Sequence, residues 1–320
     1  MAFNVQSTPP EEEQLFVSLR AKDWSDFHGQ QQVTKSLLVA IEAAQQRSEA
    51  LEHTLLYGPP GLGKTTLSHL IARESGGSLH ITSGNALGKV GDLAAILSNL
   101  QPHDVLFIDE IHRLSHTVEE TLYPAMEDFA LDIVLGKGAG ARVVRIDLPP
   151  FTLVGATTRF GALSAPLRDR FGLVHRLQYY TPEELSVIIE RAAQKLSFQI
   201  DPQIALKISE RARGTPRIAL KLLKRVRDVA QLANSETISP EHVEQGLQLQ
   251  QVDAEGLDEH DRRYLEVLQR QFKGGPVGLN TLAAALAEDS STIEEVIEPY
   301  LIQRGRSSAR LVVECWCNNY

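Results

Sequence analysis

The stretch His53-Thr-Leu-Leu-Tyr-Gly-Pro-Pro-Gly-Leu-Gly-Lys-Thr-Thr66 decides the fold of the first half of the chain. An apolar strand, Leu55–Tyr57, runs into Gly58–Thr65, and an apolar helical pattern follows from Leu67. This order matches the phosphate-binding loop G-x-x-x-x-G-K-[ST] in its required strand–loop–helix context. Its glycines let the backbone wrap closely around a β-phosphate, and the following helix adds the positive end of its dipole. The chain is therefore expected to bind a nucleoside triphosphate.

Within this loop, the residue types assign separate roles. Gly61 and Gly63 give the backbone its close approach to phosphate. Lys64 is expected to place its charge against the β- and γ-phosphates, and Thr65 to supply a hydroxyl ligand for Mg²⁺.

A second motif, Asp104-Val-Leu-Phe-Ile-Asp-Glu110, is an apolar strand that ends in two adjacent acids. Asp109, at the carboxyl end of the strand, is placed to orient Mg²⁺, usually through its water shell. Glu110 is placed to polarise a water for in-line attack on the γ-phosphate. With the loop upstream, this pair indicates hydrolysis of the triphosphate rather than its transfer to a bound acceptor.

Two further segments offer candidates for the same chemistry. The strand Thr152–Gly155 is followed by two threonines, and either Thr157 or Thr158 is a candidate for holding the attacking water. In Arg168-Asp-Arg170, one arginine is a candidate finger that reaches a neighbouring subunit's γ-phosphate, and a solvated surface is the alternative. Arg217 opens a later helix, where it is poorly placed for the helix's own dipole. Contact with a nucleotide at a domain boundary would explain that position.

Composition limits the class of protein. The 320 residues are enough for two or three domains. No run approaches the ~20 apolar residues that span a bilayer, and the N-terminus lacks the apolar core of a signal peptide. Cys315 and Cys317 are the only cysteines, which fits a reducing cytoplasm. Because the net charge is −9, a nucleic-acid contact must be local, and Arg304, Arg306 and Arg310 form such a local basic feature.

The pattern of elements changes twice along the chain. Residues 1–180 alternate short apolar strands with helices, which predicts an α/β domain with a parallel sheet. Residues 181–251 read as helix after helix with cap-then-proline starts, which predicts a small all-α domain. Residues 254–320 begin with three helices and a tight turn, consistent with a helix-turn-helix or winged-helix unit or with a generic bundle. Two alternating runs within 131–148 predict a hairpin, either an ordinary surface hairpin or a docking element.

These motifs together resemble the AAA+ ATPases and, among them, the RuvB family of bacterial Holliday-junction branch-migration motors. The resemblance runs from about Leu19 to Gln303. The strings that carry it are Gly58-Pro-Pro-Gly-Leu-Gly-Lys-Thr-Thr66, Asp109-Glu-Ile-His-Arg-Leu114, Leu122-Tyr-Pro-Ala-Met-Glu-Asp128, Gly155-Ala-Thr-Thr-Arg159, Pro166-Leu-Arg-Asp-Arg-Phe-Gly172 and Arg213-Gly-Thr-Pro-Arg-Ile-Ala219. The fold implied is an α/β AAA+ P-loop NTPase domain with a parallel sheet, followed by a small all-α lid domain and a C-terminal winged-helix-like domain.

The resemblance also implies roles for particular residues. Lys64, Asp109, Glu110, Thr158 and Arg170 would be catalytic, with Thr158 in the sensor-1 motif and Arg170 the finger. Thr65 and Asp109 would serve Mg²⁺. The nucleotide-binding set implied is Leu19, Arg20, Gly61, Gly63, Lys64, Thr65, Thr66, Glu127, Asp128, Phe129, Tyr180 and Arg217, the last as the sensor-2 residue.

The implied activity is ATP hydrolysis by a hexameric ring around duplex DNA, which drives branch migration of Holliday junctions in recombination and repair. The hairpin 131–148 would dock on the junction-binding partner RuvA, a RuvC-like resolvase is a further partner, and residues 254–303 would touch DNA. The alternatives are a clamp-loader-like switch and a protein-remodelling ATPase, neither of which translocates on DNA. A bacterial cytoplasmic location is implied.

The end of the chain departs from this family pattern. After Gln303 the family continues with an aromatic residue and an arginine-rich wing, whereas this chain reads Arg304-Gly-Arg-Ser-Ser-Ala-Arg-Leu-Val-Val-Glu-Cys-Trp-Cys-Asn-Asn-Tyr320. Our hypothesis is that this tail is out of register with the family, through a shifted reading frame. Ala309 then stands where an arginine that contacts DNA is expected. We expect ATP binding to survive, and DNA-stimulated hydrolysis and branch migration to weaken, unless Arg304, Arg306 and Arg310 substitute as phosphate contacts.

Overall fold

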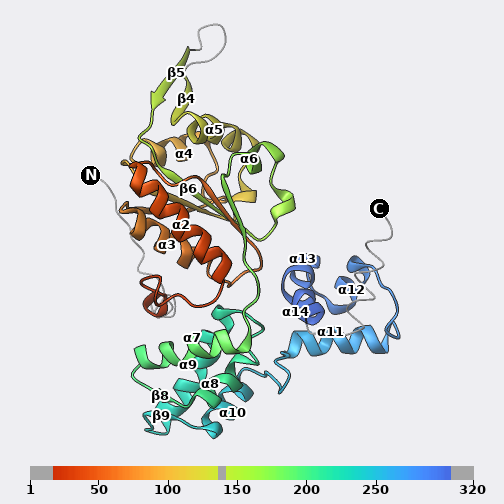
Figure 1. Cartoon of the computed structure of the whole chain (residues 1–320). Coiled ribbons are helices and arrows are strands. Elements are labelled where there is room, and N and C mark those ends of the chain that lie inside the picture. The colour runs from red at the N-terminus through yellow and green to blue at the C-terminus, as the bar shows by residue number, and fades with distance from the viewer. Residues whose placement is uncertain (1–16, 136–141, 304–320) are drawn as a thin grey trace, which may run out of the picture. The chain divides into compact units, whose positions relative to one another are not determined.

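The computed structural model describes residues 17–135 and 142–303 (Figure 1). The chain divides into two compact units, Met1–Tyr180 and Thr181–Tyr320. Across the described residues, none of the helices combines the length and apolar character that crossing a membrane requires. The arginines at 304, 306 and 310 and the expected out-of-register tail lie outside the described residues.

The first unit is built on a five-stranded parallel sheet with the strand order β2-β3-β6-β1-β7. The strands are β1 Thr54–Tyr57, β2 Leu79–Ser83, β3 Val105–Asp109, β6 Thr152–Thr157 and β7 Leu173–Arg176. The predicted α/β fold with a parallel sheet is confirmed. The strands β3 and β6 are buried along almost their whole length, as expected of strands covered on both faces.

The register of the strands decides where the site is. β1 pairs with β6 so that Tyr57 lies opposite Thr157, and β3 pairs with β6 so that Ile108 lies opposite Gly155. The carboxyl ends of these three strands therefore meet at one edge of the sheet. The phosphate-binding loop, the acid pair and the two threonines all follow those ends, so the fold brings them together.

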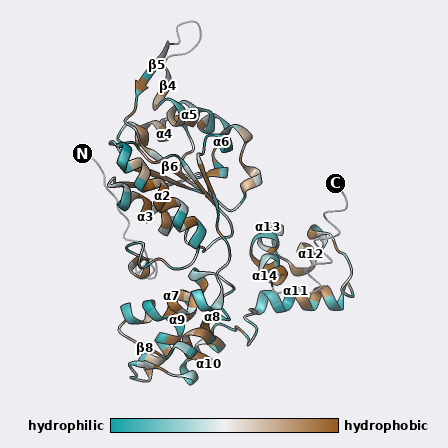
Figure 2. Cartoon of the chain, in the orientation of Figure 1, coloured by the Kyte–Doolittle hydropathy of each residue, from teal (hydrophilic) through white to brown (hydrophobic). Residues whose placement is uncertain are grey.

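Helices flank this sheet in Figure 1. They are α2 Gln31–Arg47, α3 Lys64–Ser75, α4 Val90–Leu97, α5 His116–Glu127 and α6 Ala165–Asp169. Apolar side chains of α4, α5 and α6 pack with those of β3 and β6 into one buried cluster that includes Leu106, Leu122 and Phe151. Figure 2 shows the strands of the sheet as largely hydrophobic. Burial of this cluster fixes the sheet on which the site is built.

The expected hairpin is present as two antiparallel strands, β4 Ala130–Leu135 and β5 Arg142–Asp147. Their register pairs Ala130 with Asp147 and Leu135 with Arg142. Figure 1 shows the pair extending away from the five-stranded sheet, to which it contributes no strand. The apolar side chains of Val144 and Ile146 on β5 are exposed.

The second unit begins with a helical lid made of α7 Pro182–Lys195, α8 Pro202–Ser209, α9 Pro216–Leu232 and α10 Pro240–Leu249. Three of the predicted caps form: the side chains of Thr181, Asp201 and Ser239 each accept a hydrogen bond from the first turn. Thr215 differs, because its hydroxyl donates back to the carbonyl of Ala212 instead. Two short strands that the sequence pattern did not predict, β8 Gln199–Ile200 and β9 Thr237–Ile238, pair in parallel.

The remaining part of this unit contains α11 Glu259–Arg270, α12 Leu279–Leu286, α13 Ser290–Thr292, η4 Ile293–Ile297 and α14 Glu298–Gln303. Their apolar faces form a separate core around Tyr264, Leu282 and Ile297. The last predicted helix is interrupted by one π-helical segment, η4. The three-helix pattern predicted for this region is confirmed, and the core shows that it folds around its own apolar centre.

Candidate active site

The phosphate-binding loop takes a backbone conformation that requires its glycines. Gly58, Gly61 and Gly63 have φ values of 139°, 78° and 99°, which residues with a side chain rarely adopt. A Cβ added at Gly58 would lie 2.6 Å from the carbonyl oxygen of Leu177. Gly63 is also the N-cap of α3, so the amino end of that helix opens directly onto the loop.

Lys64 lies inside this loop. Its Nζ donates to the carbonyl oxygens of Gly58 at 2.7 Å and Pro59 at 3.0 Å. Burial lowers the pKa of Lys64, while the carboxylates of Glu110 and Asp109 act in the opposite direction. The cation is therefore held between the loop and the acid pair, which is the position that contact with a phosphate requires.

The acid pair lies directly after β3. The amide of Glu110 donates to Oδ1 of Asp109 at 3.0 Å, and Glu110 itself has a left-handed backbone with φ 46°. This conformation is costly for a residue other than glycine, and it turns the chain sharply between the two carboxylates. Mg²⁺ keeps several waters and takes few protein ligands. The side chains suited to it are Asp109, at the end of β3, and Thr65, in the first turn of α3. Their oxygen chemistry fits that ion.

The two threonines after β6 contact different partners. Oε2 of Glu110 accepts a hydrogen bond from the hydroxyl of Thr158 at 3.1 Å and one from its amide at 3.3 Å. Thr157 is fully buried, and its Oγ1 accepts from the amide of Arg159 at 3.0 Å and lies 2.9 Å from Nδ1 of His112. Thr158 is therefore the one whose hydroxyl reaches the acid pair.

His112 makes a contact that the sequence pattern did not predict. Its Nδ1 lies 3.2 Å from Oε2 of Glu110 as well as beside Thr157. The short 3₁₀ helix Ile111–Arg113 turns the histidine back towards the acid two residues before it. The spacing is visible in the sequence, but side chains two residues apart do not face each other on an ordinary α-helix. Only the 3₁₀ turn after β3 brings the two groups together.

Tyr180 and Arg20 contact the loop and the helix after it, respectively. The hydroxyl of Tyr180 donates to the carbonyl of Leu62 at 3.1 Å. Its ring fills the space at Gly29, where an added Cβ would lie 2.4 Å from Cε1. Leu19 is buried, and Nη1 of Arg20 lies 3.3 Å from Nε2 of His69 on α3. The structure thus brings Tyr180 to the loop and Arg20 to the helix that follows it.

The segment Glu127–Phe129 lies elsewhere. The ring of Phe129 packs on His53, and Nε2 of His53 lies 3.0 Å from the carbonyl oxygen of Met126. His53 precedes β1, whereas the loop follows the other end of that strand. A strand of four residues spans roughly 13 Å, at about 3.3 Å per residue. The structure does not bring Glu127, Asp128 and Phe129 to the loop of their own chain.

Arg170 lies at this same distant edge. It is the C-cap of α6 and lies just before β7, whose first residue pairs with Thr54 at the start of β1. Its Nη2 forms an ion pair with Oε1 of Glu127 at 3.0 Å, and its guanidinium lies 4.2 Å from the centre of the Tyr123 ring. Arg217 lies in α9, in the second unit. Arg170 therefore does not line the loop of its own chain. Arg217 is not part of the unit that contains the loop.

Comparisons with known proteins agree with this architecture. Three family models match in order: the Holliday junction DNA helicase RuvB P-loop domain at residues 19–177, the RuvB AAA lid domain at 180–253 and the RuvB C-terminal winged helix domain at 254–306.

Solved structures of a Thermotoga maritima protein also match. The RuvB Holliday junction branch migration motor of that organism is 50% identical, with 90% of this chain and 92% of that chain covered and a TM-score of 0.82. Its T158V variant matches with the same identity, coverage and TM-score. Its R170A variant is 50% identical over 90% of this chain and 91% of that chain, with a TM-score of 0.81. The chain belongs to the RuvB family of P-loop ATPases.

Proposed function

We propose that this chain is an ATP-driven motor of the RuvB type that moves Holliday junction branch points in DNA. One observation carries the proposal: Lys64, Glu110 and Thr158 meet at the carboxyl edge of the sheet, in a chain that also has a winged-helix unit. The first feature supplies hydrolysis, and the second supplies a surface of the kind that contacts duplex DNA. A clamp-loader-like switch or a protein-remodelling ATPase would not need the winged helix.

In the proposed mechanism, the loop and Lys64 hold the triphosphate, and Thr65 and Asp109 hold Mg²⁺. When bound, Mg²⁺ would neutralise charge on the phosphate oxygens and so make the γ-phosphorus of the triphosphate more electrophilic. Glu110 accepts the proton of the attacking water as general base. The hydroxyl of Thr158 fixes Oε2 of that carboxylate. Tyr180 and Leu19 would enclose the nucleotide, and Arg217 would contact it as the sensor-2 residue.

The distant position of Arg170 supports a site shared between subunits. A cation that stabilises charge on the γ-phosphate must come from outside the loop. Arg170 and Glu127–Phe129 lie at the start of β1, about one strand length from their own chain's loop. In a closed homohexameric ring, this edge of one subunit would face the loop of the next. Arg170 then acts as the finger in trans.

Mixing two inactive variants tests the shared site. Arg170→Ala removes the finger, and Glu110→Gln removes the base, so each homogeneous ring should be inactive. In mixed rings, some interfaces carry a wild-type Glu110 site next to a wild-type Arg170, and ATP hydrolysis should partly return. If no mixing ratio restores turnover while both variants still bind ATP and assemble, the shared site is refuted.

The partners we propose follow from the surfaces of the two units. On β5, Val144 and Ile146 are exposed at alternate positions, so they share one face of the hairpin. That apolar face is suited to a RuvA-like junction-binding protein. The winged-helix unit, with Arg304, Arg306 and Arg310, would contact DNA phosphates. We also propose a RuvC-like resolvase as a further partner and a bacterial cytoplasmic location.

Comparing ATPase rates separates this function from the alternatives. We expect duplex DNA together with the junction-binding partner to increase turnover. Stimulation by an unfolded protein, with no response to DNA, would instead identify a protein-remodelling ATPase.

A further inference from the structure

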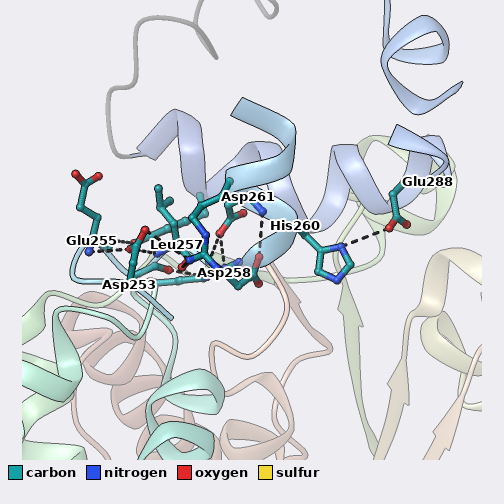
Figure 3. A network of polar contacts seen from close by, with 11 residues as sticks. Asp253, Glu255, Leu257, Asp258, His260, Asp261 and Glu288 are labelled. Carbon is teal, nitrogen blue, oxygen red and sulfur yellow. Dashed lines mark hydrogen bonds and ion pairs between the residues drawn. The ribbon is translucent and has the colours of Figure 1, made fainter. Parts of the chain in front are cut away.

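The segment between the lid and the winged-helix unit is an ordered joint. Oδ1 of Asp253 accepts hydrogen bonds from the amides of Glu255 and Leu257, both at 2.9 Å. The amide of Asp253 donates to the carbonyl of Leu257 at 3.0 Å. Figure 3 shows these contacts continuing into the first turn of α11. We call residues 253–261 the joint.

The joint ends in a reciprocal cap on α11. The amide of Asp261 donates to Oδ1 of Asp258, and the amide of Asp258 donates to Oδ2 of Asp261, both at 3.0 Å. Asp261 is fully buried, so its charge needs a partner. Burial raises its pKa to about 6, although Arg213 acts to lower it. A buried carboxylate in this position is stabilised by a cation beside it.

That cation is Arg213, which comes from the lid. Its Nη2 forms ion pairs with Asp258, at 2.6 Å, and with Asp261. Its Nε donates to the carbonyl of Gly256 at 3.3 Å, and its guanidinium lies 4.9 Å from the centre of the Tyr300 ring in α14. The hydroxyl of Tyr300 in turn donates to the carbonyl of Glu255 at 2.8 Å. One arginine thus contacts the joint, α11 and α14.

The backbone around this contact leaves little room for movement. Arg213 has φ 54° and Gly214 has φ 66°, so the chain turns left-handed just before α9. A Cβ added at Gly256 would lie 2.6 Å from the hydroxyl of Tyr300 and 3.2 Å from Cα of Arg211. The joint and the lid loop therefore touch through backbone atoms, and a packed contact of this kind transmits displacement.

We propose that Arg213 is a positioning residue that locks the lid to the winged-helix unit, so that the two move as one body. The proposal rests on the proposed function, because Arg213 lies four residues before Arg217, the residue proposed to sense the nucleotide. A movement of the lid at Arg217 would then move the winged-helix unit by the same amount, because the joint does not bend. The grouping of residues 181–320 into one compact unit is consistent with this lock.

A distance measurement tests the lock without relying on DNA activity. Nitroxide labels are placed on exposed sites, Glu244→Cys in α10 and Gln269→Cys in α11, with Cys315 and Cys317 replaced by serine. With ADP and with a non-hydrolysable ATP analogue, the full chain should give the same single narrow distance distribution. Arg213→Ala should lose that narrow distribution, and Arg213→Lys should lose it in part, because lysine keeps the charge but not the planar fork.

Arg211→Ala is the matched control, because Arg211 lies two residues away and its guanidinium donates to the carbonyl of Lys207 in the preceding turn. It should keep the narrow distribution. A broad distribution in the parent chain, or identical distributions for Arg213→Ala and Arg211→Ala, would overturn the proposal.

A second measurement tests the consequence for the motor. The ratio of branch-migration rate to ATP turnover should fall in Arg213→Ala, while binding of a fluorescent ATP analogue is retained. Partial unfolding would lower both rates together and leave their ratio unchanged. An unchanged ratio would refute transmission through Arg213. A parent chain that migrates no junction would refute the proposed function instead, and the distance measurement would still decide the lock.

Discussion

Replacement of Thr158 by valine tests the part of the site that the structure defines most closely. Valine keeps the size and shape of threonine but removes the hydroxyl that donates to Oε2 of Glu110 at 3.1 Å. The amide of residue 158 still reaches the same oxygen, at 3.3 Å in the parent chain. The substitution therefore removes one of two donors and leaves the backbone in place.

The expected size of the effect comes from the charge on the acceptor. A hydrogen bond to an ionised group contributes about 1.5–3 kcal/mol. At about 1.4 kcal/mol for each factor of ten, kcat for ATP hydrolysis should fall roughly 10- to 150-fold. Because Thr158 contacts Glu110 rather than Lys64, the affinity for ATP should change little. Single-turnover hydrolysis and equilibrium ATP binding, measured on the same preparation, separate the two quantities.

Thr157→Val is the matched control. Thr157 is fully buried and lies against His112, so its loss should lower stability and should change kcat less than the loss of Thr158. If Thr158→Val hydrolyses ATP at or above the parent rate, the hydroxyl does not orient Glu110 for proton abstraction. That result would refute a catalytic role for the contact between Thr158 and Glu110.

Three other outcomes follow from the same contacts. Lys64→Ala should abolish ATP binding in a fluorescence titration, because the alanine removes the ammonium held inside the loop, and retention of tight binding would contradict its role. Gly29 has φ 80°, and the Cβ of an alanine there would lie 2.4 Å from Cε1 of Tyr180. Gly29→Ala should therefore displace the Tyr180 ring and raise the Kd for ATP. An unchanged Kd would count against Tyr180 as part of the site. Burial lowers the pKa of His53 from 6.5 to about 4. Only the unfolded chain binds this proton between those values, so the free energy of unfolding should fall by up to about 3 kcal/mol as the pH drops from 6.5 to 4. Urea unfolding should show this loss, and His53→Gln should reduce its pH dependence.

Much of the site could be predicted because a parallel sheet places its chemistry at one edge. The loop after β1, the acids after β3 and the threonines after β6 are far apart in sequence, yet each follows a strand end. The choice between Thr157 and Thr158 could not be made in advance, because adjacent residues point in different directions. Only the register and the turn after β6 decide which hydroxyl reaches Glu110.

Other features depend on contacts that no local pattern records. The resemblance assigned Phe129 to the nucleotide together with Tyr180, whereas the fold places it beside His53. The partners of Arg213 lie 43 or more residues along the chain, at Gly256 and beyond. Arg213 precedes Gly214 and a helix that begins at Pro216, and this sequence context predicts only a turn. The missing cap at Thr215 arises in the same loop, because that hydroxyl bonds backwards to Ala212.

The contacts of Arg170 are compatible with the proposed finger role, because they orient its side chain while pairing it only weakly with a carboxylate. Its partner Glu127 is about half exposed, with 55% of its side-chain surface accessible, so the ion pair contributes only about 0–1 kcal/mol. Contact with the Tyr123 ring and a 2.7 Å hydrogen bond to the carbonyl of Pro166 fix the direction of the side chain. A guanidinium oriented by a ring and a carbonyl, and only weakly paired with a carboxylate, can exchange that carboxylate for a phosphate oxygen at small cost. In the proposed shared site, Arg170 would act only on a neighbouring subunit's loop, because α6 ends just before β7 at the edge of the sheet away from its own loop.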